Sequence, residues 1–217
     1  MKIIFATGNS HKLGEAQNVI GEAFELTMPR QVGIDGEIPE TGDTLEKNSA
    51  EKALYIWNLK HECCFADDTG LEVEALGGAP GVYTARYYSL PATFSNWDNN
   101  RAFADTVEAN MQKLLIEMDS ARKMAISNGK TDPGRRARFR TVVTLVKEGR
   151  LHQFEGVLNG RIAEQRSGCK GFGYDPVFIP DNYDCTLAEL TMEEKNAISH
   201  RGKAMRALAD FLNGNAE

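Results

Sequence analysis

The sequence has little of what marks several large classes of protein. It contains four cysteines but no C-x-x-C pair, which argues against a cysteine zinc site. No run of about 18 apolar residues occurs, so we expect no membrane-spanning segment. The apolar start at residues 1–5 is too short for a signal peptide, and we expect a cytoplasmic protein. The net charge is −6, so we expect no broad binding to nucleic acid, because such binding needs a basic surface.

What is present is enough for one sizeable core, since 41% of the 217 residues are hydrophobic. Helical and strand patterns alternate at the start of the chain, and hairpin patterns lie in the middle. We expect strands at 2–6, 25–29, 63–67, 71–76, 137–147, 150–158, 161–165 and 177–179. We expect helices at 11–24, 44–61, 99–118 and 199–212, and a further helix that follows a capping box formed by Thr191 and Glu194. We expect residues 119–136 to form a mobile connection. This order predicts an α/β protein with a mixed sheet.

The first expected strand leads into the turn Thr-Gly-Asn-Ser-His-Lys at residues 7–12. The free N–H groups and the dipole of a helix N-terminus favour an anion at such a turn, and Lys12 adds a cation. The spacing is not that of a Walker loop. An ordinary strand-to-helix turn, with Asn9 and Ser10 as caps, explains the same residues. The turn alone therefore leaves both interpretations open.

A second candidate site is the carboxylate pair Asp67 and Asp68. Neighbouring carboxylates raise each other's pKa unless a cation is near. In extended backbone they point to opposite faces, so we expect one to face a cleft and the other a different partner. A carboxylate beside bound phosphate suits Mg²⁺, with Glu40 as a candidate second ligand. A solvated acidic turn, and for Glu40 a surface-loop acid, are the alternatives.

Two further segments carry groups suited to binding a nucleotide. Glycines flank Phe172, so the backbone can approach a ligand closely and the ring can stack on a nucleobase. Asp175 precedes a proline and projects from a defined turn. Lys195, His200 and Arg201 lie where two helices are expected to meet, and an arginine binds phosphate or carbonyl oxygens in fork geometry. A plain glycine-rich turn and solvated or structural cations are the alternatives.

Taken together and in order, these segments resemble the inosine/xanthosine triphosphate pyrophosphatase (Ham1-like) family. The matching segments are 7–12, 65–71, 75–83, 171–176 and 194–202, while 87–136 carries no matching motif. The resemblance implies one domain over residues 1–217, with an elongated mixed sheet, flanking helices and two lobes around a central nucleotide cleft. It also implies a homodimer that uses Mg²⁺ to hydrolyse ITP, dITP, XTP and dXTP to the monophosphate and pyrophosphate, which cleanses the nucleotide pool.

The resemblance also implies a role for individual residues. Asp68 matches the metal-binding general base, and Thr69 matches a substrate contact where many bacterial members have serine. The triphosphate-binding turn is matched by Thr7, Gly8, Asn9, Ser10, His11 and Lys12, the base-binding turn by Phe172, Gly173, Tyr174 and Asp175, and the contacts to purine oxygens by Lys195, His200 and Arg201. Glu40 and Lys52 align with a metal carboxylate and a phosphate-binding lysine, without a motif to anchor them. Either Asp67 or Glu40 is expected as the second metal carboxylate.

Selectivity in such a site would depend on the 6-oxo group of the purine. Inosine and xanthine present a carbonyl acceptor there, and adenine presents an amino donor. Charged or suitably tautomeric donors at Lys195, His200 and Arg201 would be left unpaired by adenine. Guanine shares the 6-oxo group, so its rejection must depend on the 2-position. Two other functions stay open, a Maf-like nucleotide pyrophosphatase and a non-catalytic nucleotide-binding protein, although the latter would need no acid at Asp68.

Overall fold

The chain packs as two compact units, each assembled from segments that are separate in the sequence. The computed structural model describes residues 1–100 and 102–214, and the side chain of His11 lies outside the described part. The first unit contains 1–69, 140–157 and 198–217, and the second contains 70–139 and 158–197. Among the described helices, none is both long and apolar enough to cross a bilayer. That the two units act as one two-lobed domain stays a prediction.

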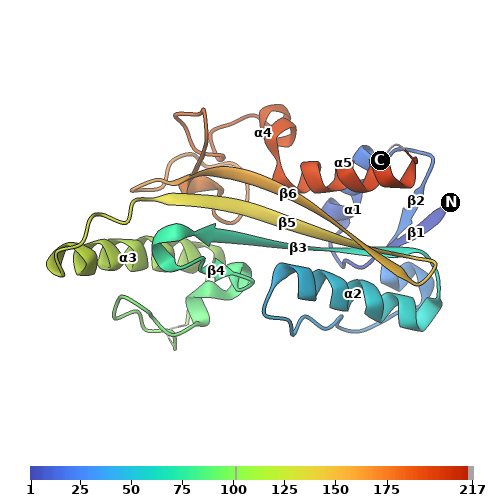
Figure 1. The fold of residues 1–217 in the computed structure, drawn as a ribbon, viewed down its shortest axis with the longest axis horizontal. Coiled ribbons are helices and arrows are strands. Elements are labelled where there is room, and N and C mark those ends of the chain that lie inside the picture. The colour runs from blue at the N-terminus through green and yellow to red at the C-terminus, as the bar shows by residue number, and fades with distance from the viewer. Residues whose placement is uncertain (101, 215–217) are drawn as a thin grey trace. The chain divides into compact units, whose positions relative to one another are not determined.

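The described residues form a mixed sheet with flanking helices, as the sequence predicts (Figure 1). The strands are β1 Lys2–Phe5, β2 Glu25–Thr27, β3 Cys64–Val73, β4 Pro80–Gly81, β5 Arg136–Lys147, β6 Arg150–Ile162 and β7 Phe178–Pro180. The helices are α1 Ser10–Ile20, α2 Leu45–Lys60, α3 Thr106–Ser127, α4 Met192–Ile198 and α5 His200–Leu212, with 3-10 turns at Pro29–Val32, Glu74–Leu76, Thr84–Ser89 and Asp175–Val177. The order is β2-β1-β3-β5-β6-β7, with β4 on β3. β1 is parallel to β2 and β3, whereas β7 is antiparallel to β6.

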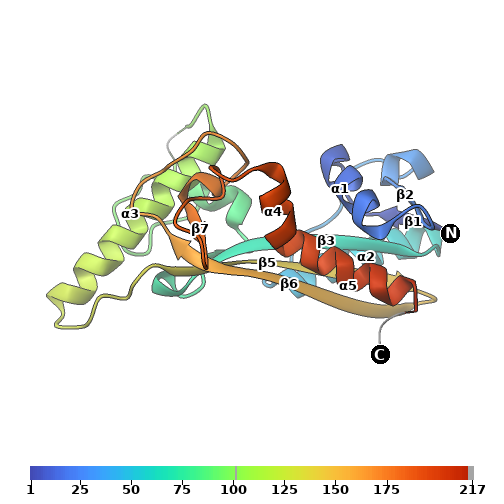
Figure 2. The same cartoon turned by 90° about the horizontal axis from the view of Figure 1, so that it is seen from above.

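In the first unit, helices cover both faces of the strands (Figures 1 and 2). α1 and α5 pack on one face against Phe5, Phe65 and Leu145. α2 packs on the other face against Ile4, Ala66 and neighbours. Successive residues of a strand point to opposite faces, so the apolar runs of β1 and β3 supply both layers of the core.

Local signals in the sequence set several of these elements. The Thr44 side chain accepts a hydrogen bond from the backbone N–H of Lys47 and caps α2. Thr191 and Glu194 form the predicted capping box before α4. Glu148 and Gly149 both have positive φ, 53° and 75°, which is the conformation of a tight hairpin between β5 and β6.

In the second unit, α3 holds the segment before it through three buried polar side chains. Asn110 accepts a hydrogen bond from the Tyr88 N–H and donates one to the Ala85 carbonyl. The ammonium group of Lys113 donates to the carbonyls of residues 87, 90 and 91. The carboxylate of Glu117 accepts from the backbone N–H groups of residues 93, 94 and 95. The segment, which has little regular structure, therefore has its backbone groups satisfied by one helix face.

Four sequence-based boundaries are wrong. The expected strands 63–67 and 71–76 are one strand, β3, followed by a 3-10 turn. Of the expected strand at 161–165, only residues 161–162 are strand, and they are the end of β6, while residues 163–165 are irregular. The long helix begins at Thr106, capped by Asp105, and continues to Ser127 through residues expected to form a mobile connection. α1 ends at Ile20 because Gly21, with φ of 84°, leaves the helical conformation.

Candidate active site

The two adjacent carboxylates of β3, Asp67 and Asp68, point to opposite faces of the strand. Asp67 lies on the face covered by α1 and α5, where it contacts Lys12 and Arg201. Asp68 lies on the face covered by α2, where it contacts Asn48 and Lys52. The alternation expected of a strand therefore separates the two charges and gives each its own cations. The opposite orientation that the sequence predicts for the pair is therefore present, and that one of the two faces a cleft stays a prediction.

Asp67 is buried, with 2% of its side chain exposed, and forms an ion pair with two cations. The ammonium group of Lys12 donates to both carboxylate oxygens, at 3.0 and 2.9 Å. The Nε atom of Arg201 lies 3.5 Å from one of them, and the Nη1 atom of Arg201 donates to Glu15 on α1. Burial alone would raise the pKa of Asp67, but these cations outweigh it and lower the pKa to about 2. Asp67 is therefore ionised at neutral pH and orients Lys12 and Arg201.

Asp68 sits among donors of a different kind. The side-chain amide of Asn48 donates to one carboxylate oxygen at 3.1 Å, and the Lys52 ammonium lies 3.6 Å from the other. The side-chain oxygen Oδ1 of Asn48 accepts from the Gly42 N–H at 2.7 Å, which fixes the side-chain amide with its nitrogen toward Asp68. Burial raises the pKa of Asp68, opposed by Lys52 and Asn48 and reinforced by nearby carboxylates. A carboxylate with a raised pKa is suited to accept a proton.

Lys52 joins Asp68 to the loop that carries Glu40. Its ammonium group donates to Glu40 at 2.5 Å, and the Lys52 side chain is buried while that of Glu40 is partly exposed. Burial alone would lower the pKa of Lys52, but the carboxylates of Asp68, Glu40 and Asp67 raise it overall. Lys52 therefore stays charged between two carboxylates.

The turn at residues 7–12 is ordered by its own side chains. The Thr7 hydroxyl accepts from the Asn9 N–H at 3.1 Å, and the side-chain oxygen Oδ1 of Asn9 accepts from the Lys12 N–H at 3.2 Å. Asn9 thereby caps α1. Gly8 and Ser10 lie exposed in the same turn. The turn is thus a capped strand-to-helix turn whose Lys12 side chain reaches the buried Asp67.

His200 lies at the start of α5 in a chain of hydrogen bonds that crosses three elements. The Thr141 hydroxyl oxygen of β5 lies 2.7 Å from His200 Nδ1 and 2.8 Å from the hydroxyl oxygen of Thr69 on β3. α5 also lies directly against β6, because a Cβ atom on Gly156 would come within 2.0 Å of the His200 carbonyl oxygen. The ring of His200 is therefore held by Thr141 and its backbone by close contact with Gly156.

The remaining predicted residues lie in the second unit. The Asp175 carboxylate accepts from the Phe172 N–H at 2.7 Å and pairs with the Lys195 ammonium. Tyr174 is buried, with its hydroxyl donating to the Thr84 carbonyl, and burial raises the pKa of Tyr174. Phe172 is 80% exposed beside Gly173, which has a φ of 64°. Of the two aromatic rings, Tyr174 anchors the turn and Phe172 is accessible for stacking.

Among the residues that the structure describes, no three His, Cys, Asp or Glu side chains are gathered as a ready metal cluster. The donor chemistry around Asp68 nevertheless fits Mg²⁺, which takes one or two carboxylates and completes its shell with phosphate oxygens and water. Asp68 and Glu40 both contact the Lys52 ammonium, so a positive charge already lies between them. Asp67 is less suited, because Lys12 already takes both of its oxygens.

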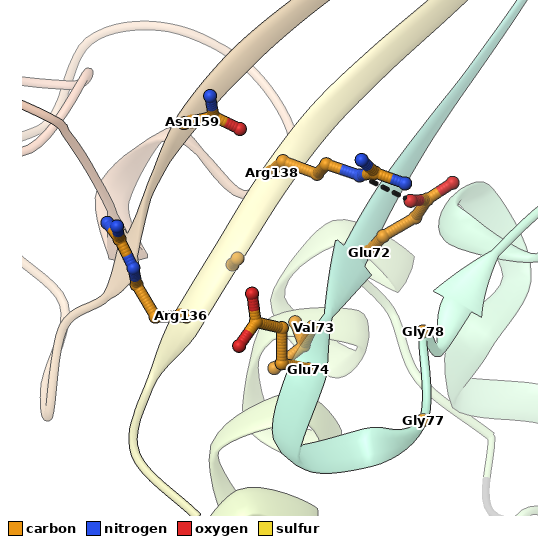
Figure 3. A pocket seen from close by; sticks show the side chains of 9 residues that line it. Glu72, Val73, Glu74, Gly77, Gly78, Arg136, Arg138 and Asn159 are labelled. Atoms are coloured by element: carbon orange, nitrogen blue, oxygen red, sulfur yellow. Dashed lines mark hydrogen bonds and ion pairs between the residues drawn. The ribbon is translucent and has the colours of Figure 1, made fainter.

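The second unit also contains a pocket that is lined by none of the site residues described above. Its volume is about 580 Å³, and Figure 3 shows Glu72 paired with Arg138 on one side and Arg136 and Asn159 on the other. The Nε atom of Arg138 lies 2.7 Å from the Oε2 atom of Glu72. None of the predicted site residues lines it, and its charges are already paired in part, so it gives no support to a second ligand.

Sequence reasoning missed two residues of the site, Asn48 and Thr141. Both are buried inside regular elements, and both contact residues far away in the chain. A polar residue in an otherwise apolar strand face, as Thr141 is beside Phe139 and Val143, was the only signal available.

Comparison with known proteins relates nearly the whole chain to one family. The Ham1 family model matches residues 3–211. A dITP/XTP pyrophosphatase of Flavobacterium johnsoniae is 42% identical over 212 residues, which cover 98% of each chain. Among solved structures, a HAM1 protein from Coxiella burnetii has a TM-score of 0.83 at 32% identity, covering 99% of each chain. The Staphylococcus aureus Ham1 protein has a TM-score of 0.80 at 33% identity, covering 100% of each chain.

Proposed function

The chain belongs to the Ham1 family, and from this premise we infer that it is a nucleoside triphosphate pyrophosphatase acting on non-standard purine nucleotides such as dITP and XTP. The observation that carries this function is the full-length similarity to dITP/XTP pyrophosphatases. The buried, donor-held carboxylate of Asp68 supports it, because pyrophosphate release needs a proton acceptor for water. The match also favours the purine enzymes over a Maf-like or non-catalytic protein.

We propose that Asp68 acts as the general base. Asn48 holds its carboxylate in one orientation, in which it can accept a proton from water. The water oxygen forms a bond to the α-phosphorus, and the bond from that phosphorus to the bridging α–β oxygen breaks. The water proton passes to Asp68, and pyrophosphate leaves. Lys12 and Lys52 offset the phosphate charge as cations held by carboxylates.

Mg²⁺ is proposed as the cofactor, with Asp68 and Glu40 as its protein ligands. When bound, a hard divalent cation offsets negative charge on the phosphates. Lys52 would have to turn from Glu40 toward the substrate, because its ammonium now occupies the space that both carboxylates face.

The base would be selected by its 6-oxo group, through Lys195, His200 and Arg201, and Phe172 would stack on the purine. The ion pair with Asp175 orients one such donor, Lys195. Adenine, with an amino group in place of the carbonyl, would leave these donors unpaired.

The function is tested by turnover of dITP, XTP, dGTP and ATP with Mg²⁺, with pyrophosphate and orthophosphate assayed separately. Pyrophosphate from dITP and XTP, with little from dGTP or ATP, is the expected result. Orthophosphate as the direct product would mean cleavage at the γ-phosphorus and would contradict the mechanism. Binding without turnover would favour a sensor.

We also propose, from the family resemblance, that the enzyme is a homodimer in the cytoplasm that binds no nucleic acid. The net charge of −6 supports the last point. Light scattering should give a mass near twice 24.0 kDa, and a mass of one chain at micromolar concentration would contradict the dimer.

A further inference from the structure

A hydroxyl that no motif includes connects the neighbour of the general base to the purine-binding histidine. Thr141 is fully buried in β5. Its oxygen lies 2.8 Å from that of Thr69, the residue after Asp68, and 2.7 Å from Nδ1 of His200. Both distances are those of good hydrogen bonds, so the three side chains form one continuous chain.

The chain of hydrogen bonds constrains where the protons lie. A hydroxyl has one proton and two lone pairs, so Thr141 can donate to at most one of its two neighbours. If Thr69 donates to Thr141 and Thr141 donates to His200, the neutral ring carries its proton on Nε2. If the hydrogen bonds run in the opposite direction, from His200 to Thr141 to Thr69, then His200 donates from Nδ1, and in the neutral ring Nε2 is an acceptor. The direction of the chain thus decides what the second ring nitrogen offers to a ligand.

We propose that Thr141 is a positioning residue that donates to Nδ1 of His200 and so holds the neutral ring with its proton on Nε2. This rests on the proposed function, because a 6-oxo purine presents an acceptor and needs an N–H donor. With the reverse tautomer, the neutral ring would present an acceptor and would suit the amino group of adenine instead. Thr141 therefore contributes to base selectivity without contacting the base.

The backbone around His200 is held by two contacts that do not involve its ring. Gly156 lets α5 lie so close to β6 that no side chain fits between them. Ser199 caps α5 through the N–H of Gly202, which fixes the residue before His200. The backbone that carries the ring therefore has a fixed position.

The first test reads the tautomer directly. Long-range ¹H–¹⁵N correlation spectra of the ¹⁵N-labelled full chain at pH 8 distinguish a proton on Nε2 from one on Nδ1. Wild type and Thr141→Ser, which keeps the hydroxyl, should show His200 with its proton on Nε2. Thr141→Val, which keeps the shape and removes the hydroxyl, should show a mixture of both forms. A proton on Nδ1 in the wild type would overturn the proposal.

The second test reads selectivity. The ratio of kcat/KM for dITP to that for dATP should fall about tenfold or more in Thr141→Val and be restored in Thr141→Ser. Thr144→Val is the matched control, because Thr144 is equally buried on β5 but bonds to Ser49 and Gln153. It should change neither the tautomer nor the ratio. An unchanged ratio in Thr141→Val would overturn the proposal.

The two readouts separate this proposal from the function on which it rests. If the wild type hydrolyses neither dITP nor XTP, the proposed function fails, whatever the tautomer is. If dITP is hydrolysed selectively but the tautomer and the ratio ignore the hydroxyl at position 141, only the positioning role fails.

Discussion

Replacing Asp67 by asparagine should destabilise the protein far more than the loss of one charge at its surface. The carboxylate is 2% exposed and holds Lys12 and Arg201, which the variant would leave without their shared counter-charge. Its pKa falls from 3.8 to about 2 on folding, which corresponds to a stabilisation on the order of 2 kcal/mol. Removing one partner of a buried ion pair costs about 3–5 kcal/mol in general. We therefore expect Asp67→Asn to lower the free energy of unfolding by about 2–5 kcal/mol at pH 7.

The pH dependence gives this prediction a second readout. Because the folded-state pKa of Asp67 is lowered, its contribution is complete above pH 3.8 and is lost as the pH falls toward 2. Asp67→Asn should remove that part of the acid destabilisation. Urea unfolding followed by circular dichroism, at one protein concentration, measures both effects.

Asp43→Asn is the control for this experiment. Asp43 also pairs with a lysine, Lys47, but the two side chains are 73% and 64% exposed. The free energy of unfolding of this variant should stay near that of the wild type, because solvent screens an exposed pair. If Asp67→Asn is no more destabilising than the control, the reasoning from burial and charge is refuted.

Three further predictions concern catalysis, selectivity and packing. Asp68→Asn should lower kcat at least about 100-fold while a non-hydrolysable ITP analogue still binds, and near-wild-type turnover would exclude Asp68 as the base. Lys195→Ala should lower the dITP to dATP ratio of kcat/KM more than it changes the Mg²⁺ dependence, and an unchanged ratio would contradict its role. Gly156→Ala should cost about 1–3 kcal/mol of stability because its Cβ would meet the His200 carbonyl oxygen, whereas Gly14→Ala, with open space around it, should not destabilise, as thermal unfolding can show.

The opposite orientation of Asp67 and Asp68 was predictable, but the continuity of their strand was not. Two acids followed by Thr69 and Gly70 suggest a turn, and the sequence therefore predicts two short strands. The structure has one strand from Cys64 to Val73. Like charges fit inside it because cations distant in the chain meet each of them on a separate face. No local pattern records where those cations lie.

Some residues of the candidate site could likewise be predicted from the sequence, and others could not. Asp68 and Arg201 were found through motifs, since a motif marks residues that face a ligand, whereas Lys52 was assigned only through the family resemblance, outside any motif. Asn48 and Thr141 face other protein groups, and their partners are 20 and 59 positions away in the sequence. Contacts of this kind follow from tertiary packing. The boundaries of α3 show the same limit, because a solvated helix surface is as polar as a loop.

The buried polar face of α3 has a consequence for how the second unit opens. The backbone of residues 85–95 finds its partners in Asn110, Lys113 and Glu117 rather than in a neighbouring strand. If that segment moved away, the buried ammonium group of Lys113 and the carboxylate of Glu117 would lose their hydrogen-bond partners. Partial opening therefore costs free energy even when only part of the segment moves. The segment and the helix therefore form one cooperative unit, and the amide hydrogens of residues 93–95 should exchange with solvent only when the helix itself undocks.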